Sequence, residues 1–250
     1  MKISGNTILI TGGGSGIGAA LAGALHAKGN RVIVAGRRRD ALESVAAAHP
    51  GMATATLDVS DEDAIASGVE RIVADHPDLN VVIHNAGIMI AEDVTTDPYD
   101  LSIAEGIIAT NLLGPIRLTA ALLPYLKRQP RASIVTVSSG LAFVPLVATP
   151  TYNATKAAIH SWTQAIRAQL ADTSVDVMEI VPPAVATDLM PGHADNPNSM
   201  PLGAFTDEVM ALIEANPEAP EIHVERVKFL SEAERRGEYG QVFGMLNAQH

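Results

Sequence analysis

Thr7-Ile-Leu-Ile-Thr-Gly-Gly-Gly-Ser-Gly-Ile-Gly18 is an apolar, β-branched run that ends in a glycine-rich turn, and an alanine- and leucine-rich segment at 19–28 follows it. The run is typical of a strand buried on both faces, and the later segment is typical of a helix. Glycines let a backbone approach a pyrophosphate, and a helix N-terminus offers free N–H groups and a positive dipole end. The stretch therefore predicts a dinucleotide-binding turn, although its spacing, Gly12-x-x-x-Gly16-x-Gly18, differs from the commonest fingerprint.

Six further short apolar segments alternate with helical patterns along the chain. They predict strands at 31–35, 53–57, 80–83, 132–137, 175–181 and 222–224, giving about seven in all. This alternation predicts an α/β fold, with a doubly wound, mostly parallel, Rossmann-like sheet and helices on both faces. Ligands of such sheets bind at the carboxyl ends of the strands, where Gly12–Gly18 and Asn85–Gly87 are expected.

No domain boundary is evident, so residues 1–250 are expected to form a single dinucleotide-binding and catalytic domain. Residues 188–204 are rich in proline, glycine and asparagine, with several apolar members. That composition fits a mobile lid over a substrate site, and the alternative is an insertion without function.

The composition excludes several classes of protein. The chain has 250 residues, no cysteine and a formal net charge of −11 at pH 7. Disulfides, thiol catalysis and cysteine-ligated metals are therefore excluded, and the eight histidines lack metal-ligand spacing, so no metal site is expected. The negative charge argues against nucleic acid and anionic membranes as partners. Without a signal-peptide pattern or an apolar run of about 20 residues, a cytoplasmic protein is expected.

The second predicted strand ends in three consecutive arginines, Arg37, Arg38 and Arg39, with no acid at the strand tip. In a dinucleotide fold this position faces the adenosine ribose, where an acid suits NAD and arginine suits the 2′-phosphate of NADP. Because the chain has only 17 basic residues, the cluster favours NADP(H) over NAD(H), the alternative being a solvated basic turn. Asp40 is expected to cap a helix. Asp58, after the third strand, is either structural or a contact to adenine.

Tyr152 and Lys156 are four residues apart, which places them on one face of a helix, one turn apart. An ammonium near a phenol favours the phenolate, which would bring a pKa of about 10 closer to working pH. Alone, such a pair is more often a surface feature. Asn111 lies in a long helical pattern at 99–128, where an asparagine is more often a buried structural amide than a catalytic one. Gly114-Pro115 predicts a bend nearby.

Together these motifs resemble those of the short-chain dehydrogenase/reductase family, in its single-domain branch. The matching motifs are Thr11-Gly12-x-x-x-Gly16-x-Gly18, Asn85-Ala86-Gly87, Asn111, Ser139, Tyr152-x-x-x-Lys156 and the turn at 182–187. Two positions depart from the family pattern. His84 stands where asparagine is usual, with a mild expected effect. Pro183 replaces a glycine, which removes an N–H and can change contacts on the nicotinamide side.

The resemblance implies catalytic roles for Asn111, Ser139, Tyr152 and Lys156. Tyr152 would exchange a proton with the substrate oxygen, and Lys156 would lower the tyrosine pKa and bind the nicotinamide ribose. Ser139 would hydrogen-bond the substrate, and Asn111 would hold a water that links Lys156 to solvent. The cofactor is expected to contact Gly12, Ser15, Gly16, Ile17, Gly18, Arg37, Arg38, Asp58, Asn85, Ala86, Gly87, Tyr152, Lys156, Pro182, Val185 and Thr187. The substrate is expected to contact Ser139, Leu141, Phe143, Val144, Tyr152, Leu189 and Met190.

These expectations combine into an NADP(H)-dependent oxidoreductase that interconverts a hydrophobic ketone or aldehyde and an alcohol, as a carbonyl reductase (ketoreductase) or alcohol dehydrogenase does. Two alternatives stay open. One is an NAD-linked alcohol dehydrogenase working oxidatively, which only the Arg37 region opposes. The other is a non-catalytic dinucleotide sensor on the same fold. The resemblance also implies a homotetramer or dimer, paired partly through the helices that carry Asn111 and Tyr152.

Overall fold

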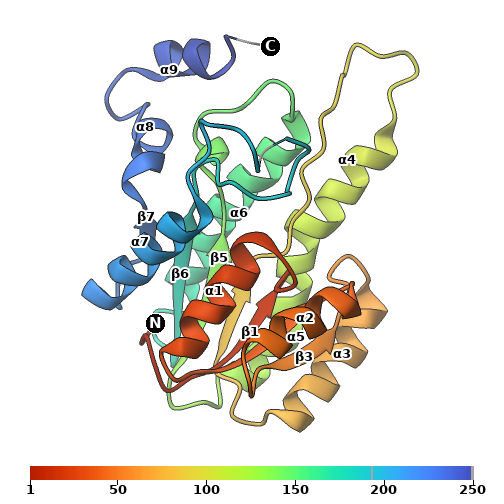
Figure 1. The fold of residues 1–250 in the computed structure, drawn as a ribbon, viewed down its shortest axis with the longest axis vertical. Coiled ribbons are helices and arrows are strands. Elements are labelled where there is room, and N and C mark those ends of the chain that lie inside the picture. Colours follow the sequence, from red (N-terminus) through yellow and green to blue (C-terminus); the bar gives the residue numbers. More distant parts are fainter. Residues whose placement is uncertain (193, 249–250) are drawn as a thin grey trace.

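Seven short apolar segments form one sheet in the computed structural model, which describes residues 1–192 and 194–248 (Figure 1). The strands are β1 (Thr7–Thr11), β2 (Arg31–Gly36), β3 (Ala53–Thr56), β4 (Val81–His84), β5 (Ala132–Val137), β6 (Val175–Val181) and β7 (Glu221–His223). Their order is β3-β2-β1-β4-β5-β6-β7, and every pairing is parallel. The strand order reverses between β1 and β4, so the predicted doubly wound α/β fold is confirmed.

Helices cover both faces because successive side chains of a strand point to opposite sides. One face carries α1 (Gly16–Ala27), α2 (Arg39–Ala48) and α7 (Leu202–Ala215), and the other carries α3 (Glu62–Asp75), α5 (Gly114–Leu126) and α6 (Pro150–Gln169). In β1, Ile8 and Ile10 pack in the first core, whereas Leu9 packs in the second. Burial on both faces explains why the strands are continuous apolar runs.

One long apolar helix changes its winding in the middle. α4 (Leu101–Ile108) runs into a π-helical turn, η1 (Ala109–Leu113), and continues as α5. The π turn lies directly before Gly114-Pro115, near which a bend was predicted. By length and composition the 26 residues from Leu101 to Leu126 could cross a bilayer, but 44% of their most apolar window is buried inside the fold. Core helices of soluble proteins pass the same test, so this feature is weak evidence for a membrane span.

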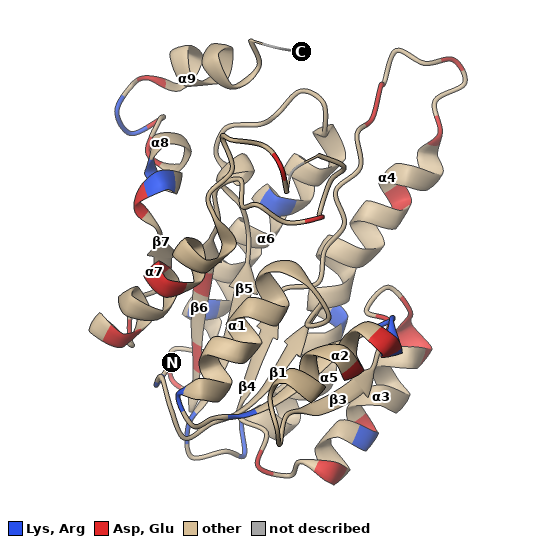
Figure 2. Cartoon of the chain, viewed as in Figure 1, with Lys and Arg blue, Asp and Glu red and all other residues tan. Residues whose placement is uncertain are grey.

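Acidic side chains cap some helices but not α2. Asp61 precedes α3 and accepts the Ala64 N–H at 3.0 Å, and Asp100 does the same for Ser102 at the start of α4. Asp40 lies inside the first turn of α2 and makes no cap bond, so the expectation that it caps this helix is wrong. Its charge still suits the positive end of the helix dipole. Figure 2 shows acidic residues on α2, α3, α4 and α7, so the negative charge is spread over several helices.

The predicted lid, residues 188–204, forms turns before α7 begins, and His193 lies outside the described residues. The segment is anchored where Val185 bridges to Met200, whose N–H donates to the Ala184 carbonyl at 2.8 Å. Residues 191–192 and 194–198, which precede the Met200 anchor in the sequence, are exposed. Movement of the segment over a ligand stays a prediction.

The chain after β7 returns to the loop between β5 and α6. It forms η3 (Glu225–Val227), α8 (Lys228–Ser231) and α9 (Tyr239–Leu246), at the upper left of Figure 1. Val242 packs with Val144 in a small core. Asn247 donates to the Pro145 carbonyl at 3.1 Å and accepts the Val147 N–H at 2.7 Å. The tail therefore supports a loop that borders the site described next.

Candidate active site

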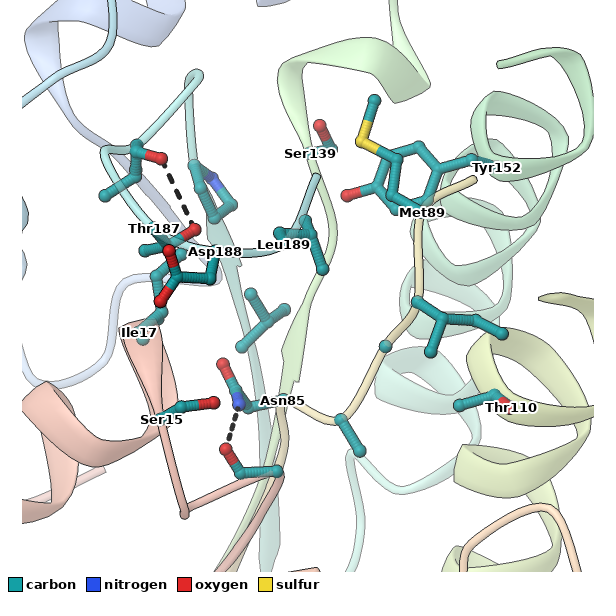
Figure 3. A pocket seen from close by; sticks show the side chains of 18 of the residues that line it. Ser15, Ile17, Asn85, Met89, Thr110, Ser139, Tyr152, Thr187, Asp188 and Leu189 are labelled. Atoms are coloured by element: carbon teal, nitrogen blue, oxygen red, sulfur yellow. Dashed lines mark hydrogen bonds between the residues drawn. The ribbon is translucent and has the colours of Figure 1, made fainter. Parts of the chain in front are cut away.

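A cavity of about 540 Å³ opens at the carboxyl ends of the strands, between the glycine turn and α6 (Figure 3). Parallel sheets bind their ligands at this edge. Most residues predicted to contact cofactor line the cavity: Gly12, Ser15, Gly16, Ile17, Arg37, Arg38, Asp58, Asn85, Ala86, Gly87, Tyr152, Lys156, Pro182, Val185 and Thr187. Ser139, Leu141 and Leu189 line its other end. The structure therefore brings most of the predicted cofactor set and part of the predicted substrate set into one cavity.

The glycine turn, residues 12–18, approaches β4 so closely that side chains are excluded. Gly12 has a φ of 65°, and a Cβ there would lie 2.8 Å from the Ala86 Cα. A Cβ on Gly18 would lie 2.3 Å from the Gly12 carbonyl oxygen. The expectation for Gly18 is corrected, because it lies behind the cavity wall and lets α1 pack on the turn.

Thr11 and Asn85 tie the glycine turn to the end of β4. Thr11 Oγ1 accepts the N–H groups of Asn85 and Ala86, each at 3.1 Å, and Asn85 Nδ2 donates to the Thr11 carbonyl at 3.0 Å. The neighbouring His84 is buried, and its Nε2 lies 2.8 Å from Thr119 Oγ1. Burial lowers the pKa of His84 to about 3, so the ring is neutral at pH 7. The departure thus puts a neutral hydrogen-bonding ring in place of an amide, and its mild effect stays a prediction.

Two of the three consecutive arginines reach the cavity. Arg37 and Arg38 line it, whereas Arg39 pairs with Glu43 on α2 at 2.6 Å. Arg38 Nη2 donates to Ser15 Oγ at 3.2 Å, which links the basic turn to the glycine turn. Two guanidinium groups at one end of a cavity offer the charge and the donors that a phosphate requires.

Asp58 lies at the same end of the cavity, after β3. Its Oδ1 accepts the Ser60 N–H at 2.9 Å and the Ser60 hydroxyl at 2.7 Å. Burial works to raise the pKa of Asp58, but the Ser60 hydrogen bonds and the charge of Arg37 hold it below its usual range. Asp58 therefore has a structural partner and also borders the cavity, so both interpretations of this residue stand.

Tyr152 and Ser139 meet at the opposite end of the cavity (Figure 3). Tyr152 lies in the first turn of α6, and Ser139 follows β5 and accepts the Leu141 N–H at 3.1 Å. The tyrosine is 5% exposed, and this burial raises the pKa of Tyr152 to about 12, with a Ser139 hydrogen bond acting in the opposite direction. Tyr152 is therefore a protonated phenol at neutral pH.

Lys156 lies one turn further along α6 and is also buried. Its Nζ donates to the Val137 carbonyl at 2.8 Å and lies 5.5 Å from the centroid of the Tyr152 ring. Burial lowers the pKa of Lys156 to about 8, while the negative charge of Glu179 acts to raise it. Burial of the phenol dominates, so the net shift of the Tyr152 pKa is upward rather than downward, and the lowering contribution expected from the Lys156 charge stays a prediction.

Asn111 is buried in the π turn, and its amide is occupied by protein groups. Its Oδ1 accepts the Ile88 N–H and its Nδ2 donates to the Ile88 carbonyl, both at 2.9 Å. A longer bond of 3.3 Å reaches Thr155 Oγ1. A Cβ on Gly87 would lie 3.4 Å from Asn111 Oδ1 and 3.7 Å from Lys156 Nζ. Asn111 thus fixes the chain after β4 beneath Lys156, and the water-holding role implied by the resemblance stays a prediction.

The wall around Tyr152 is apolar. Leu141 and Leu189 line the cavity as predicted, and Met190 packs against Tyr152 in a cluster with Met89. The apolar lining residues that were not predicted include Ile88, Met89, Leu146, Leu230 and Leu246. The last two come from α8 and α9, so the apolar character of the tail was the signal that could have revealed them.

Phe143 and Val144 do not belong to this wall, so that part of the substrate prediction is wrong. Val144 is fully buried with Ala233 and Val242. Phe143 packs its ring 4.7 Å from the His160 ring, behind α6. The short helical turn η2 (Gly140–Ala142) sends successive side chains in different directions, which an apolar stretch of sequence does not reveal.

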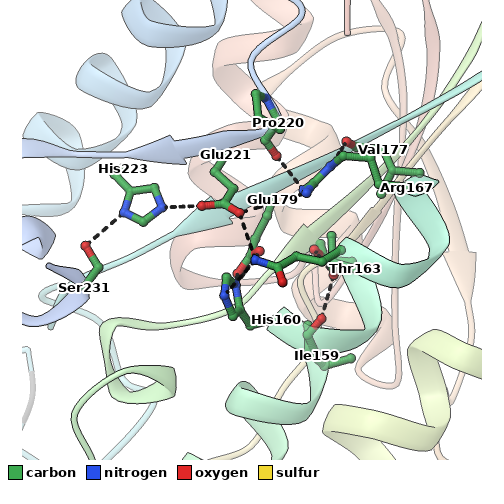
Figure 4. A network of polar contacts seen from close by, with 12 residues as sticks. Ile159, His160, Thr163, Arg167, Val177, Glu179, Pro220, Glu221, His223 and Ser231 are labelled. Atoms are coloured by element: carbon green, nitrogen blue, oxygen red, sulfur yellow. Dashed lines mark hydrogen bonds and ion pairs between the residues drawn. The ribbon is translucent and has the colours of Figure 1, made fainter. Parts of the chain in front are cut away.

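A second polar cluster lies behind α6 (Figure 4). His160, Glu179 and Glu221 come from α6, β6 and β7, and their potential metal-ligating atoms lie within 4.8 Å of one another. These atoms already pair within the protein: His160 Nδ1 lies 2.9 Å from Glu179 Oε2, and His223 Nε2 lies 3.1 Å from Glu221 Oε2. Sequence spacing could not reveal the cluster, because it exists only when β6 and β7 are neighbours.

The cavity fits a dinucleotide. Its volume lies within the range of small-molecule sites. The glycine turn presents bare backbone to it, since side chains at Gly12 would clash. Ser138 Oγ borders the cavity, is buried, and has no hydrogen-bond partner among the described residues. Such a group is costly unless a ligand pairs with it.

Sequence comparison assigns the chain to a known family. Residues 6–198 match the family model described as short chain dehydrogenase. The chain belongs to the short-chain dehydrogenase family. The resemblance inferred from the motifs is therefore confirmed, and the protein is an oxidoreductase of this family.

Two curated relatives of this short-chain dehydrogenase are themselves described only in general terms. Over 251 residues it is 39% identical to the uncharacterized oxidoreductase DltE of Bacillus subtilis (strain 168), covering 100% of this chain and 99% of the relative. It is 32% identical over 181 residues to the uncharacterized oxidoreductase SAR2567 of Staphylococcus aureus (strain MRSA252), covering 72% and 78% of the two chains.

Solved structures show the same fold at lower identity. A short chain dehydrogenase from Burkholderia cenocepacia J2315 in complex with NADP is 24% identical, with a TM-score of 0.81 over 97% of this chain and 99% of that one. A short chain dehydrogenase/reductase from Burkholderia phymatum in complex with NAD is 18% identical, with a TM-score of 0.79 over 95% and 96%.

Proposed function

We propose that this short-chain dehydrogenase is an NADP(H)-dependent enzyme that interconverts a hydrophobic ketone or aldehyde and an alcohol, with Tyr152 as the acid and base. The observation that carries the proposal is the pairing of a buried phenol with the Ser139 hydroxyl at one end of a cavity whose other end is a bare glycine turn. Such an arrangement suits a reaction in which a proton donor and a hydroxyl act on one carbonyl oxygen.

In the reductive direction Tyr152 gives its proton to the carbonyl oxygen, which the Ser139 hydroxyl helps to hold. The phenol suits this role because its pKa of about 12 keeps it protonated at neutral pH. Lys156 is an ammonium below its pKa of about 8, so its charge stabilises the phenolate that remains on Tyr152. A bound nicotinamide supplies the hydride in this direction and accepts it in the other.

The preference for NADP(H) rests on Arg37 and Arg38, which line the cavity end beyond the glycine turn. Their guanidinium groups can bind a 2′-phosphate with charge-assisted hydrogen bonds. The NADP complex of the Burkholderia cenocepacia enzyme supports this choice, while the NAD complex of the Burkholderia phymatum enzyme shows that the fold accepts either dinucleotide.

The substrate class follows from the wall around Tyr152. Leu141, Leu146, Met89 and Leu246 present apolar surface to the cavity. Asp188 also lines it, and its negative charge disfavours a carboxylate or a phosphate ester. A moderately bulky apolar ketone or aldehyde therefore fits this wall better than a charged substrate.

The test is consumption of NADPH and NADH, measured in parallel, with a panel of aliphatic and aryl ketones and aldehydes. We expect turnover, with NADPH preferred by about tenfold or more in kcat/KM. A carboxylate-bearing analogue of the best ketone is the matched control and should react poorly. A preference for NADH would contradict the roles of Arg37 and Arg38 only. Dinucleotide binding without turnover across the whole panel would contradict the enzyme and support a sensor.

The outer faces of α4 and α6 support a homo-oligomer. Leu101 and Ile108 are exposed on α4, 59% and 39% respectively. Ile108 also borders a shallow apolar hollow shared with Ala154 and Ala158 of α6. Exposed apolar patches of this kind mark interfaces. Size-exclusion chromatography with light scattering should show a dimer or tetramer that Ile108→Glu weakens, and a monomeric wild type would contradict the proposal.

A further inference from the structure

Glu179 is a carboxylate in the interior of the fold, and the reaction proposed above does not use it. It lies on β6 and is 0% exposed. A buried carboxylate is costly unless it is paired, and His160 Nδ1 lies 3.0 and 2.9 Å from its two oxygens. His160 is partly exposed, so the pair joins a fully buried carboxylate to a ring that solvent reaches, and Figure 4 shows both side chains.

The fold places this pair beside Lys156. His160 follows Lys156 by four residues on α6, so both side chains leave the same face of the helix. Glu179 lies in register with Thr136 on β5. Thr136 directly precedes Val137, whose carbonyl accepts the Lys156 ammonium at 2.8 Å. The carboxylate and the ammonium therefore lie over neighbouring strands, beneath one helix face.

We propose that Glu179, held in place by His160, is a positioning residue that keeps Lys156 charged and directed toward the active site. The proposal rests on the proposed function, because it gives the charge of Lys156 a use in the reaction. It requires that Glu179 acts on Lys156 through its negative charge rather than through its volume.

The other charged groups near the Glu179–His160 pair have partners of their own. On α6, Arg167 donates to the Val177 and Pro220 carbonyls and lies 3.9 Å from Glu221. On β7, Glu221 is hydrogen-bonded to His223 and Gln164. Tyr152 is neutral at working pH. Among the residues that the structure describes, His160 and Lys156 are thus the basic groups that interact with Glu179.

The sign of the interaction follows from these charges. Burial lowers the pKa of Lys156 to about 8, and the Glu179 carboxylate opposes that change. The Glu179 hydrogen bond raises the pKa of His160. While His160 is protonated the pair has no net charge, and once His160 loses its proton the pair carries −1. The attraction on Lys156 therefore grows as the pH rises through the pKa of His160.

The experiment measures the pKa of Lys156 directly in the folded full-length protein, without turnover. The chain has five lysines, so the protein labelled with ¹³C at lysine Cε gives few signals, and Lys156→Arg assigns the relevant one. Glu179→Gln removes the charge and keeps the shape. We expect the pKa of Lys156 to fall by about half a pH unit or more, and the alkaline limb of ketone reduction to move with it.

Two further variants keep the test decisive. Glu221→Gln removes a carboxylate of the same cluster and should leave the Lys156 titration unchanged. Glu179→Asp keeps the charge, and it should keep the Lys156 titration near that of the wild type even if it lowers stability. An unchanged Lys156 pKa in Glu179→Gln would overturn the proposal, and so would a wild-type titration that a metal chelator shifts. A shifted Lys156 pKa without any ketone reduction would support the positioning role while contradicting the proposed function.

Discussion

The glycine turn and the first turns of α6 build the two ends of one cavity by opposite means. In the turn, bare glycine backbone provides part of the surface beside Ser15 and Ile17, and a side chain on Gly12 or Gly18 would overlap neighbouring main-chain atoms. On α6 the side chains of Tyr152 and Lys156 provide the surface, and burial shifts the pKa of both. We therefore expect added side-chain atoms to be most damaging in the glycine turn, and the removal of functional groups to be most damaging on α6.

The sharpest test at the α6 end is Tyr152→Phe, which removes one oxygen and keeps the ring. We expect kcat to fall by about a thousandfold, because general acid–base catalysis contributes roughly 10²–10⁴. The affinity for NADPH, measured by fluorescence titration, should change little. Tyr125→Phe on α5 is the matched control and should keep full activity. If the Tyr152→Phe variant stays active, Tyr152 is not the acid and base of the reaction.

The pH dependence should separate the two directions of the reaction. Oxidation requires the Tyr152 phenolate, and a folded-state pKa of about 12 leaves little phenolate at pH 7. The single-turnover rate of alcohol oxidation should therefore rise by about tenfold per pH unit in the range just above neutrality. Ketone reduction uses the phenol and should be level there until Lys156 loses its charge near pH 8. An oxidation rate independent of pH would contradict the raised pKa.

At the glycine turn, added volume should be the damaging change. Gly18→Ala puts a methyl group against the Gly12 carbonyl, and we expect it to lower the free energy of unfolding by about 1–3 kcal/mol and to weaken NADPH binding. Gly106→Ala on α4 is the control, because its Cβ meets no atom within 4 Å, and it should be neutral or stabilising by up to about 1 kcal/mol. Urea denaturation measures both, and equal effects at the two positions would break the comparison.

In the basic turn beyond the glycines, charged side chains should matter. Arg37→Ala removes a guanidinium from the cavity, so the KM for NADPH should rise by about tenfold and the KM for NADH should not. Arg39→Ala removes the arginine that pairs with Glu43 and should affect neither. Parallel rises in both KM values would show that Arg37 supports the fold rather than a 2′-phosphate.

The smallest expected effect lies behind α6. The Glu179 hydrogen bond raises the pKa of His160, so the stability from this pair is fully present below the unfolded pKa of about 6.5 and is lost as pH rises through the folded value. His160→Gln should therefore cost about 1 kcal/mol more at pH 6 than at pH 9. Urea denaturation at the two pH values measures this difference. A cost that does not change with pH would mean that the imidazole is neutral.

Local patterns were enough to predict most of the frame of the molecule. β1 spans Thr7–Thr11 as expected, and Tyr152 and Lys156 lie one helical turn apart, because strand burial and helix spacing are properties of short stretches. The family motifs then indicated which strand ends meet. Arg37 and Arg38 were found in the same way, as neighbours of a strand end.

Features that depend on distant contacts could not be predicted. The directions of Phe143 and Val144 are set by the turn η2 and by packing against the tail, not by their apolar character. The Glu179–His160 pair requires β6 beneath α6. The raised pKa of Tyr152 reflects how deeply the phenol is buried, whereas the spacing to Lys156 suggested the opposite direction.

The π turn at Ala109–Leu113 carries a consequence for how this chain tolerates changes in length. Deleting a residue from an α-helix normally rotates everything beyond it by about 100°, which turns its buried stripe away from the core. A π turn holds one surplus residue, so a deletion within it would join α4 and α5 as one continuous α-helix with both buried stripes still in phase. The fold would tolerate that deletion, but the two hydrogen bonds between Asn111 and Ile88 would be lost. The surplus residue of the π turn is therefore needed to position Asn111 in the site, and the packing of the helix does not require it.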